Sequence, residues 1–198
     1  MFDSSAGFTG PLRREAGTET VKVRFPSDDE WVERSRAWHV NISRLGRGVS
    51  ETSVENLKAD LDLYRKIRDE SSPDLVAEEA AKIIEVITRC EVINCTLGLD
   101  EAIVDMIVTG GQRVKHTLRL PTTAEVTTFK RTSARVMDLP HGRQQVRNNI
   151  HAGATLFEKC TRGHEGYANG VPIAHRDSAM RAVIDACELE TEGGGEDF

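Results

Sequence analysis

The sequence predicts an α+β protein in which a small antiparallel sheet is packed by about five helices. One observation is the strict alternation of apolar with basic or polar side chains over residues 113–120, which is typical of a strand with one buried face. Another is a recurring Ser or Thr followed three positions later by Glu, ahead of apolar residues spaced by three or four, the pattern of capped amphipathic helices.

The composition limits which classes of protein this chain can belong to. The chain has 198 residues, 38% of them hydrophobic, and a net charge of −6. No stretch approaches the ~18 apolar residues of a membrane span, and no apolar run follows basic residues near the N-terminus. We therefore expect neither a membrane segment nor a secretory signal. Four cysteines are too few for a disulfide scaffold, which favours reduced thiols in a cytosolic compartment.

The charge is unevenly distributed along the chain. Residues 102–151 carry eight basic and three acidic side chains, a net +5, between flanking segments of net −7 (51–101) and −5 (152–198). Self-association between unlike patches, neutralisation within the fold, or an anionic partner would each account for this pattern.

The N-terminal segment begins with residues 1–20, which are rich in Gly, Ser and Thr and predict a flexible arm. Residues 21–25 alternate apolar and basic side chains, so they predict a short edge strand that could join the sheet. Its end is expected at Pro26, because proline cannot donate a ladder hydrogen bond.

A helix is predicted from Ser27, which forms a capping box with Glu30. One face of this helix is formed by Trp31, Ser35, Trp38 and Ile42. We interpret this stripe as core packing in preference to an anchor for a partner. The run 44–48 contains two glycines and two arginines but lacks phosphate-loop spacing, so it predicts a turn in preference to an anion site.

Residues 52–88 predict an antiparallel pair of helices. Thr52 opens a capping box for the first helix, which should run to about Asp69. Ser72 as N-cap and Pro73 at the first helical position predict the start of the second helix.

The predicted sheet is centred on a hairpin over residues 91–120. A first strand is expected over 91–97 and a second over 99–108, although 101–108 would also fit a helical turn. The paired glycines in 109–112 favour a tight turn into the third strand. On that strand we expect Val114, His116, Leu118 and Leu120 to face the core and Arg113, Lys115, Thr117 and Arg119 to face outward.

The C-terminal part is predicted to be mainly helical. Thr122 and Glu125 form a third capping box, and the apolar stripe that follows continues to Val136. A second helix is expected over 143–159. A glycine-rich loop over 163–172 then leads to a last helix that begins near Asp177.

The expected organisation therefore has three parts. Residues 1–20 form the arm, residues 21–187 form a single α+β domain, and residues 188–198 form an acidic tail. Within the domain, the helical pair occupies 52–88, and the hairpin with its helices occupies 91–187.

The sequence predicts no catalytic residue, metal ligand or cofactor. Cys90 and Cys95 are separated by four residues and Cys160 and His164 by three, without the tight repeated pairs of a zinc site. In an extended strand the first two cysteines would also point to opposite faces. No Gly-x-Ser-x-Gly nucleophile motif is present, and His116 lies in the apolar register of its strand, where a core histidine is expected.

Six basic side chains are predicted to form a partner-binding face. They are Arg113, Lys115, Arg119, Lys130, Arg131 and Arg135. Phosphate contacts from such residues would bind nucleic acid, so a nucleic-acid-associated protein using the segment 113–147 is the alternative. The segment has a single aromatic residue, Phe129, which belongs to an apolar stripe and leaves no platform for base stacking.

Three stretches carry a resemblance to a known family: residues 23–31 with 45–48, residues 117–125, and residues 166–168 with 171–173. Together they resemble small bacteriophage and prophage proteins of the tail module, particularly tail assembly chaperone-like proteins. In these proteins a basic strand ending in Pro-Thr and followed by a helix that opens with Glu is a recurring pattern.

The resemblance implies a non-enzymatic role in the host cytoplasm during assembly, or in the virion itself. The implied partners are tail, tape-measure or other virion proteins. Self-association, which the uneven charge suggests, is a separate expectation, and no membrane contact is expected. The smallest chaperones of this kind lack the long N-terminal arm and the extra helical pair. The protein could therefore be a permanent component of the particle as well as a transient chaperone.

Overall fold

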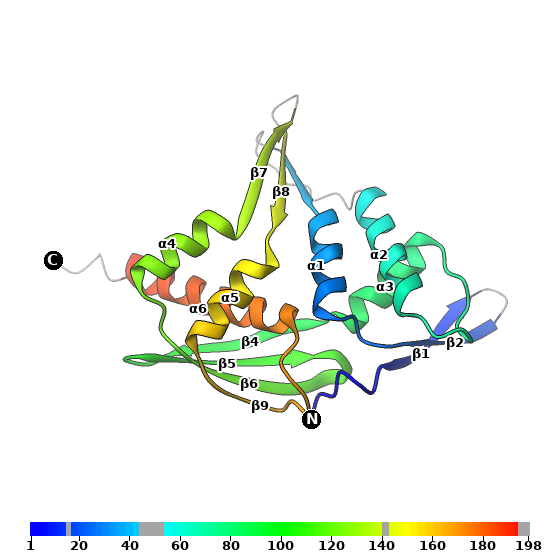
Figure 1. Ribbon diagram of the computed structural model, residues 1–198, viewed down its shortest axis with the longest axis horizontal. Helices are drawn as coiled ribbons and strands as arrows, with labels where there is room; N and C mark the ends of the chain where they lie inside the picture. The colour runs from blue at the N-terminus through cyan, green and yellow to red at the C-terminus, as the bar shows by residue number, and fades with distance from the viewer. Residues whose placement is uncertain (15–16, 44–53, 140–142, 194–198) are drawn as a thin grey trace. The chain divides into compact units, whose positions relative to one another are not determined.

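The structure is a computed structural model that describes residues 1–14, 17–43, 54–139 and 143–193 (Figure 1). Its helices and antiparallel sheets confirm the predicted α+β class. The chain divides into two compact units, and the single domain predicted for residues 21–187 stays a prediction. Unit 1 comprises Met1–Phe2, Arg89–Ser133 and Ile150–Phe198, and unit 2 comprises Asp3–Thr88 and Ala134–Asn149.

Unit 1 is built on a four-stranded antiparallel sheet with the strand order β4-β5-β6-β9. Its strands are β4 (Cys90–Leu97), β5 (Glu101–Val108), β6 (Gln112–Arg119) and β9 (Thr161–Glu165). The predicted hairpin is confirmed, and the helical alternative for 101–108 is wrong. Gly110 and Gly111 adopt φ angles of 75° and 71° in the tight turn, a conformation that glycine adopts without strain. The strand β9 begins two residues before the predicted glycine-rich loop and takes up its first part.

Three helices complete unit 1: α4 (Thr123–Thr132), α5 (Ile150–Cys160) and α6 (Ile173–Gly193). Figure 1 shows α5 and α6 on one side of the sheet, where α5 contacts β6 and α6 contacts β4 and β5. The sheet and α6 share a core of fully buried side chains that includes Val104, Met106, Leu118, Met180 and Val183.

The two covering helices approach each other closely at Gly153 of α5. A Cβ added there would lie 2.0 Å from Asp177 Oδ1 and 2.9 Å from Asp177 Cα, so only glycine fits without movement. Burial raises the pKa of Asp177, while the hydrogen bond from Arg181 opposes that rise.

The ends of the helices in unit 1 differ from the sequence expectations. The capping box of Thr122 and Glu125 is confirmed, but α4 ends at Thr132, before the predicted stripe reaches Val136. The last helix begins at Ile173 instead of near Asp177. It continues to Gly193 through the beginning of the predicted acidic tail, whereas residues 194–198 lie outside the described chain.

Unit 2 begins with an antiparallel hairpin where a flexible arm was predicted. It comprises β1 (Phe8–Arg14) and β2 (Gly17–Val23), and the edge strand predicted for 21–25 is the end of β2, paired with β1 instead of the 91–120 hairpin. Leu12, Val21 and Val23 are buried in a core with side chains from two helices. Burial of these residues gives the segment a fixed place that its Gly-rich composition did not suggest.

The helices of unit 2 are α1 (Asp28–Ala37), α2 (Val54–Ile67) and α3 (Ala77–Ile87). The capping box of Ser27 and Glu30 is confirmed. The helix then ends at Ala37, and its C-cap residue Trp38 is extended with φ −76° and ψ 135°, so the predicted helical stripe to Ile42 is wrong. The helix predicted after residue 52 is confirmed as α2, although Thr52 and the run 44–48 lie outside the described residues.

The second helix of the predicted pair begins four residues later than Pro73. Ser72 does not cap it, because its hydroxyl group accepts from the Lys22 amide at 2.8 Å and donates to the Lys22 carbonyl at 2.7 Å. These bonds join the connector between α2 and α3 to β2.

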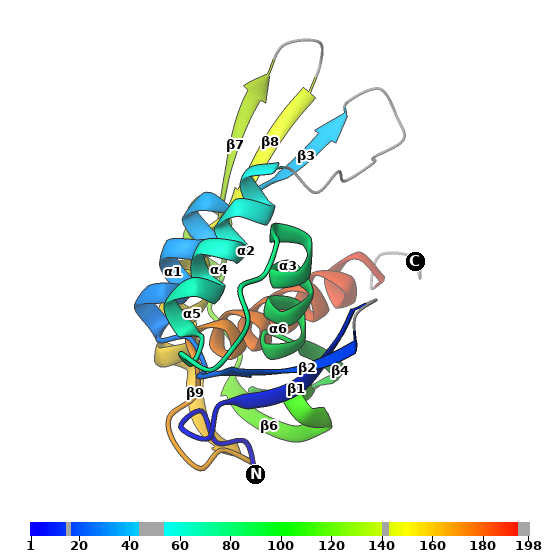
Figure 2. The ribbon, with the colours of Figure 1, turned by 90° about the vertical axis from the view of Figure 1, so that its right-hand side faces the viewer.

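A three-stranded antiparallel sheet with the order β3-β8-β7 completes unit 2 (Figure 2). Its strands are β3 (Val40–Ser43), β7 (Ala134–Leu139) and β8 (Arg143–Asn148). The helix predicted over 143–159 is therefore wrong in its first part, where β8 pairs with two other strands. Among the described residues, no helix has the length and apolar character needed to cross a membrane.

Candidate functional site

The side of the four-stranded sheet that α5 and α6 leave uncovered is the candidate interaction surface, and we call it the outer face. On β6, Val114, His116 and Leu118 are buried, while Lys115 and Thr117 between them are partly exposed. The predicted alternation of this strand is confirmed. On β5, Ala102, Val104, Met106 and Val108 are likewise buried, so Glu101, Ile103, Asp105 and Ile107 contribute to the outer face.

The outer face is balanced in charge, because neighbouring strands place carboxylates beside the basic residues of β6. Lys115 lies opposite Asp105 of β5 on one side and opposite Glu165 of β9 on the other. Arg119 lies opposite Glu101 in the same register. The sequence of β6 alone suggests a strongly basic surface. In the folded sheet, Lys115 and Arg119 lie beside acidic side chains of the neighbouring strands.

The charged groups of the outer face differ in whether they form ion pairs within the described chain. Arg119 is paired with Glu125 at 2.6 Å, and Glu101 is paired with Arg162 at 3.3 Å. Within the described part of the chain, Asp105 and Lys115 form no ion pair with each other or with another residue. They are therefore the charged groups at the centre of the outer face that are available to an external partner.

The Arg119–Glu125 pair has a structural role. Its two hydrogen bonds, of 2.9 and 2.6 Å, join the end of β6 to the first turn of α4. Glu125 also accepts from the Thr122 amide at 2.9 Å. The hydrogen bonds from Arg119, followed by the one from Thr122, lower the pKa of Glu125 to about 2.

The six basic residues predicted as a partner-binding face lie on three elements. Arg113, Lys115 and Arg119 belong to β6. Lys130 and Arg131 belong to α4, where Lys130 pairs with Glu188 at 2.5 Å. Arg135 belongs to β7 in unit 2, directly opposite Arg147 of β8.

A buried polar cluster lies beneath the sheet in unit 1. The Tyr167 hydroxyl group lies 3.0 Å from His116 Nε2 and 3.2 Å from His175 Nδ1, so it can donate to one ring and accept from the other. The Phe2 ring packs 5.9 Å from the Tyr167 ring and 5.2 Å from the His175 ring. His116 has no exposed surface, which confirms the expectation of a core histidine.

The cluster holds two histidines in their neutral form. Burial, followed by the charges of His175 and His164, lowers the pKa of His116 to about 4. Burial likewise lowers the pKa of His175 to about 4 and raises the pKa of Tyr167. The partners of His116 were missed from the sequence, because Tyr167 was assigned to a loop and His175 precedes the expected start of the last helix.

Two further features bear on chemistry, the cysteines of β4 and a small pocket in unit 2. Cys90 and Cys95 share the inner side of the sheet, since they pair with the buried Val108 and Val104, and a bulge between Val92 and Asn94 restores the register. The prediction that they point to opposite faces is therefore wrong. Burial raises the pKa of Cys90 to about 12, so its thiol stays protonated. In the described parts of the chain, no group of three or more His, Cys, Asp or Glu is placed to hold a metal ion.

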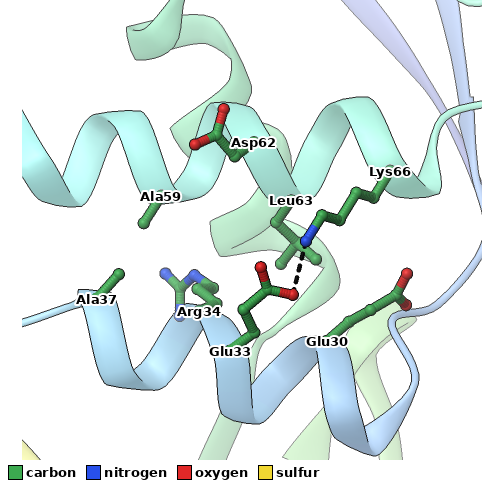
Figure 3. Close-up of a pocket in the computed structure, with 8 residues that line it drawn as sticks. All are labelled: Glu30, Glu33, Arg34, Ala37, Ala59, Asp62, Leu63 and Lys66. Carbon is green, nitrogen blue, oxygen red and sulfur yellow. Dashed lines mark hydrogen bonds and ion pairs between the residues drawn. The ribbon is translucent and has the colours of Figure 1, made fainter.

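The pocket lies between α1 and α2 of unit 2 and has a volume of about 70 Å³ (Figure 3). Lys66 pairs with Glu33 at 2.6 Å across its mouth, and Arg34 pairs with Asp60 at 2.5 Å. The volume is far below the ~300–1,000 Å³ of typical small-molecule sites. The pocket is thus a gap bridged by ion pairs and is not the candidate site.

No protein-family model matches the chain, and no curated protein or solved structure is similar to it.

Proposed function

We propose that the protein is a non-enzymatic assembly or structural component of a bacteriophage tail or particle, and that it acts through protein–protein contacts at the outer face. The observation that carries the proposal is the row in which Lys115 stands between Asp105 and Glu165. Protein interfaces combine apolar contacts with complementary charges, and the isoleucines Ile103 and Ile107 lie on either side of this row.

The same row weighs against a polyanion as the partner of this face. Nucleic-acid binding depends on a net positive potential, and the acidic residues of β5 and β9 offset the charge of β6. The tail-module resemblance supplies the biological setting of the proposal, which places the protein in the host cytoplasm during assembly or in the finished particle.

The nucleic-acid alternative keeps one observation in its favour, in unit 2. Arg135 lies directly opposite Arg147 in the β7–β8 hairpin, and like charges in that position destabilise a sheet unless an anion neutralises them. Loss of a DNA or RNA mobility shift at low salt on Arg135→Glu would support this alternative. The absence of any shift by the native protein would exclude it.

Site-specific photocrosslinking tests the proposed function. A photoreactive amino acid at Ile103 should crosslink to a particle protein, either a further copy of this chain or a tail, tape-measure or other particle protein produced together with it. The control position is Val86, an exposed apolar residue of α3 with 45% of its surface accessible. Crosslinks from position 103 to nucleic acid, or no more protein crosslinks from 103 than from 86, would contradict the proposal.

A further inference from the structure

We propose that the partner seated on the outer face is a second copy of this chain, stacked face to face across a two-fold axis parallel to β5 and β6 and above the midline between them. This inference rests on the proposed function, because it requires the outer face to make protein contacts. It specifies both the partner and the arrangement of its strands.

The charges of the outer face are complementary to themselves in this arrangement. Rotation about the stated axis places β5 of one copy above β6 of the other without a shift along the strands. The register in which Asp105 lies opposite Lys115 then sets Asp105 of each copy above Lys115 of the other. Two equivalent ion pairs form, from the groups that have no ion-pair partner within the described chain.

The apolar residues fit the same arrangement. Ile103 lies opposite Thr117 and Ile107 lies opposite Arg113 within the sheet. The rotation therefore brings each isoleucine over the threonine methyl group or the arginine stem of the other copy. These contacts surround the central charges with apolar surface, as in the packing of two sheets about 10 Å apart.

The area of the face sets the size of the expected interface. The strands β4, β5 and β6 have eight residues each, and β9 has five. At ~3.3 Å per residue and ~4.8 Å between strands, the face covers about 500 Å² per copy. Both copies together bury roughly 1,000 Å², the lower limit for a specific interface. We therefore expect a monomer–dimer equilibrium with a dissociation constant in the micromolar range.

Charge reversal tests this arrangement. Lys115→Asp alone and Asp105→Lys alone each set like charges against each other in a homodimer, so each should weaken dimerisation at least tenfold. An equimolar mixture of the two variants should form a heterodimer, because both contacts between the chains are then complementary. Within each chain the like-charge repulsion persists, so recovery in the mixture can arise only between chains.

Sedimentation-velocity and native mass-spectrometry measurements over a range of concentrations distinguish these species. Lys58→Asp, at an exposed position on α2, is the matched charge-reversal control and should dimerise like the native chain. Far-UV circular dichroism establishes that every variant is folded.

The inference is overturned if the native chain stays monomeric at hundreds of micromolar. It is also overturned if the single reversals dimerise as well as the native chain, or if their mixture yields no heterodimer. These failures would leave the proposed function intact provided that position 103 still crosslinks to another particle protein. Loss of those crosslinks would remove the proposed function itself.

Discussion

Mild acid is expected to destabilise unit 1 through its buried histidines. The pKa values of His116 and His175 are lowered from 6.5 to about 4 by burial. Between these values the unfolded chain binds protons that the folded chain does not bind. The stability contributed by the neutral rings is therefore complete above pH 6.5 and is lost as the pH falls toward 4.

The size of the effect follows from the shifts. A lowering from 6.5 to about 4 corresponds to roughly 3 kcal/mol for each ring, at about 1.4 kcal/mol per pKa unit. With both rings titrating, the free energy of unfolding should fall by up to about 2.7 kcal/mol per pH unit. A typical domain is stable by about 5–15 kcal/mol, so unit 1 should lose a large part of its stability by pH 4.5.

Urea unfolding between pH 7.5 and 4.5 measures this loss. Both tryptophans, Trp31 and Trp38, belong to unit 2, so their fluorescence follows that unit, while far-UV circular dichroism follows both. We expect a pH-dependent transition in circular dichroism that tryptophan fluorescence does not share. The pKa of Glu30 and that of Glu125 are lowered to about 2, so the stability these carboxylates contribute is lost only below about pH 4.5.

Replacement of one ring tests the assignment. His175→Gln should halve the dependence of the unfolding free energy on pH. An unchanged slope in His175→Gln would show that the His175 ring does not contribute to the acid destabilisation. Where that variant is too unstable, NMR titration of the native imidazoles provides the same test, and rings that become protonated near pH 6.5 would contradict it.

Three further substitutions, two of them with a matched control, have defined outcomes in urea unfolding. Gly153→Ala should cost about 1–3 kcal/mol through overpacking between α5 and α6, whereas Gly170→Ala, with open space around its Cβ position, should be near neutral. Thr122→Ala should cost about 1 kcal/mol by removing the N-cap of α4, and no loss would mean that the cap is dispensable. Met106→Ala should cost about 2–5 kcal/mol, and Ile107→Ala on the outer face clearly less; equal losses would contradict the assignment of the two faces.

The features that were predictable from the sequence are local ones. The capping box of Thr122 and Glu125 and the alternation along β6 each depend on residues a few positions apart. The strands β7 and β8 were missed, because Val136 and Val146 also fit helical spacing. Their strand conformation is fixed by pairing with each other and with β3, about a hundred residues earlier in the chain.

For the outer face, the direction of the basic side chains was predictable from the sequence, whereas the neutralisation of their charge was not. The outward direction of Arg113, Lys115 and Arg119 follows from the alternation of successive side chains between the two faces of a strand. The neutralisation of their charge depends on Asp105 and Glu165, whose positions opposite Lys115 are set by the strand register. The Tyr167 hydroxyl group and His116, which form a hydrogen bond, are 51 positions apart in the sequence. No local sequence pattern predicts a contact at this separation.

The sheet β3-β8-β7 has a consequence for synthesis on the ribosome. Its first strand, Val40–Ser43, can form its hydrogen bonds only after its partner strand, Arg143–Asn148, has been translated. The chain passes between the two units at residues 2/3, 88/89, 133/134 and 149/150. Neither unit is one continuous stretch of sequence, so the nascent protein should gain protease resistance late and in two steps. Unit 2 should become resistant after residue 149 has emerged from the exit tunnel, and unit 1 only after α6 has emerged.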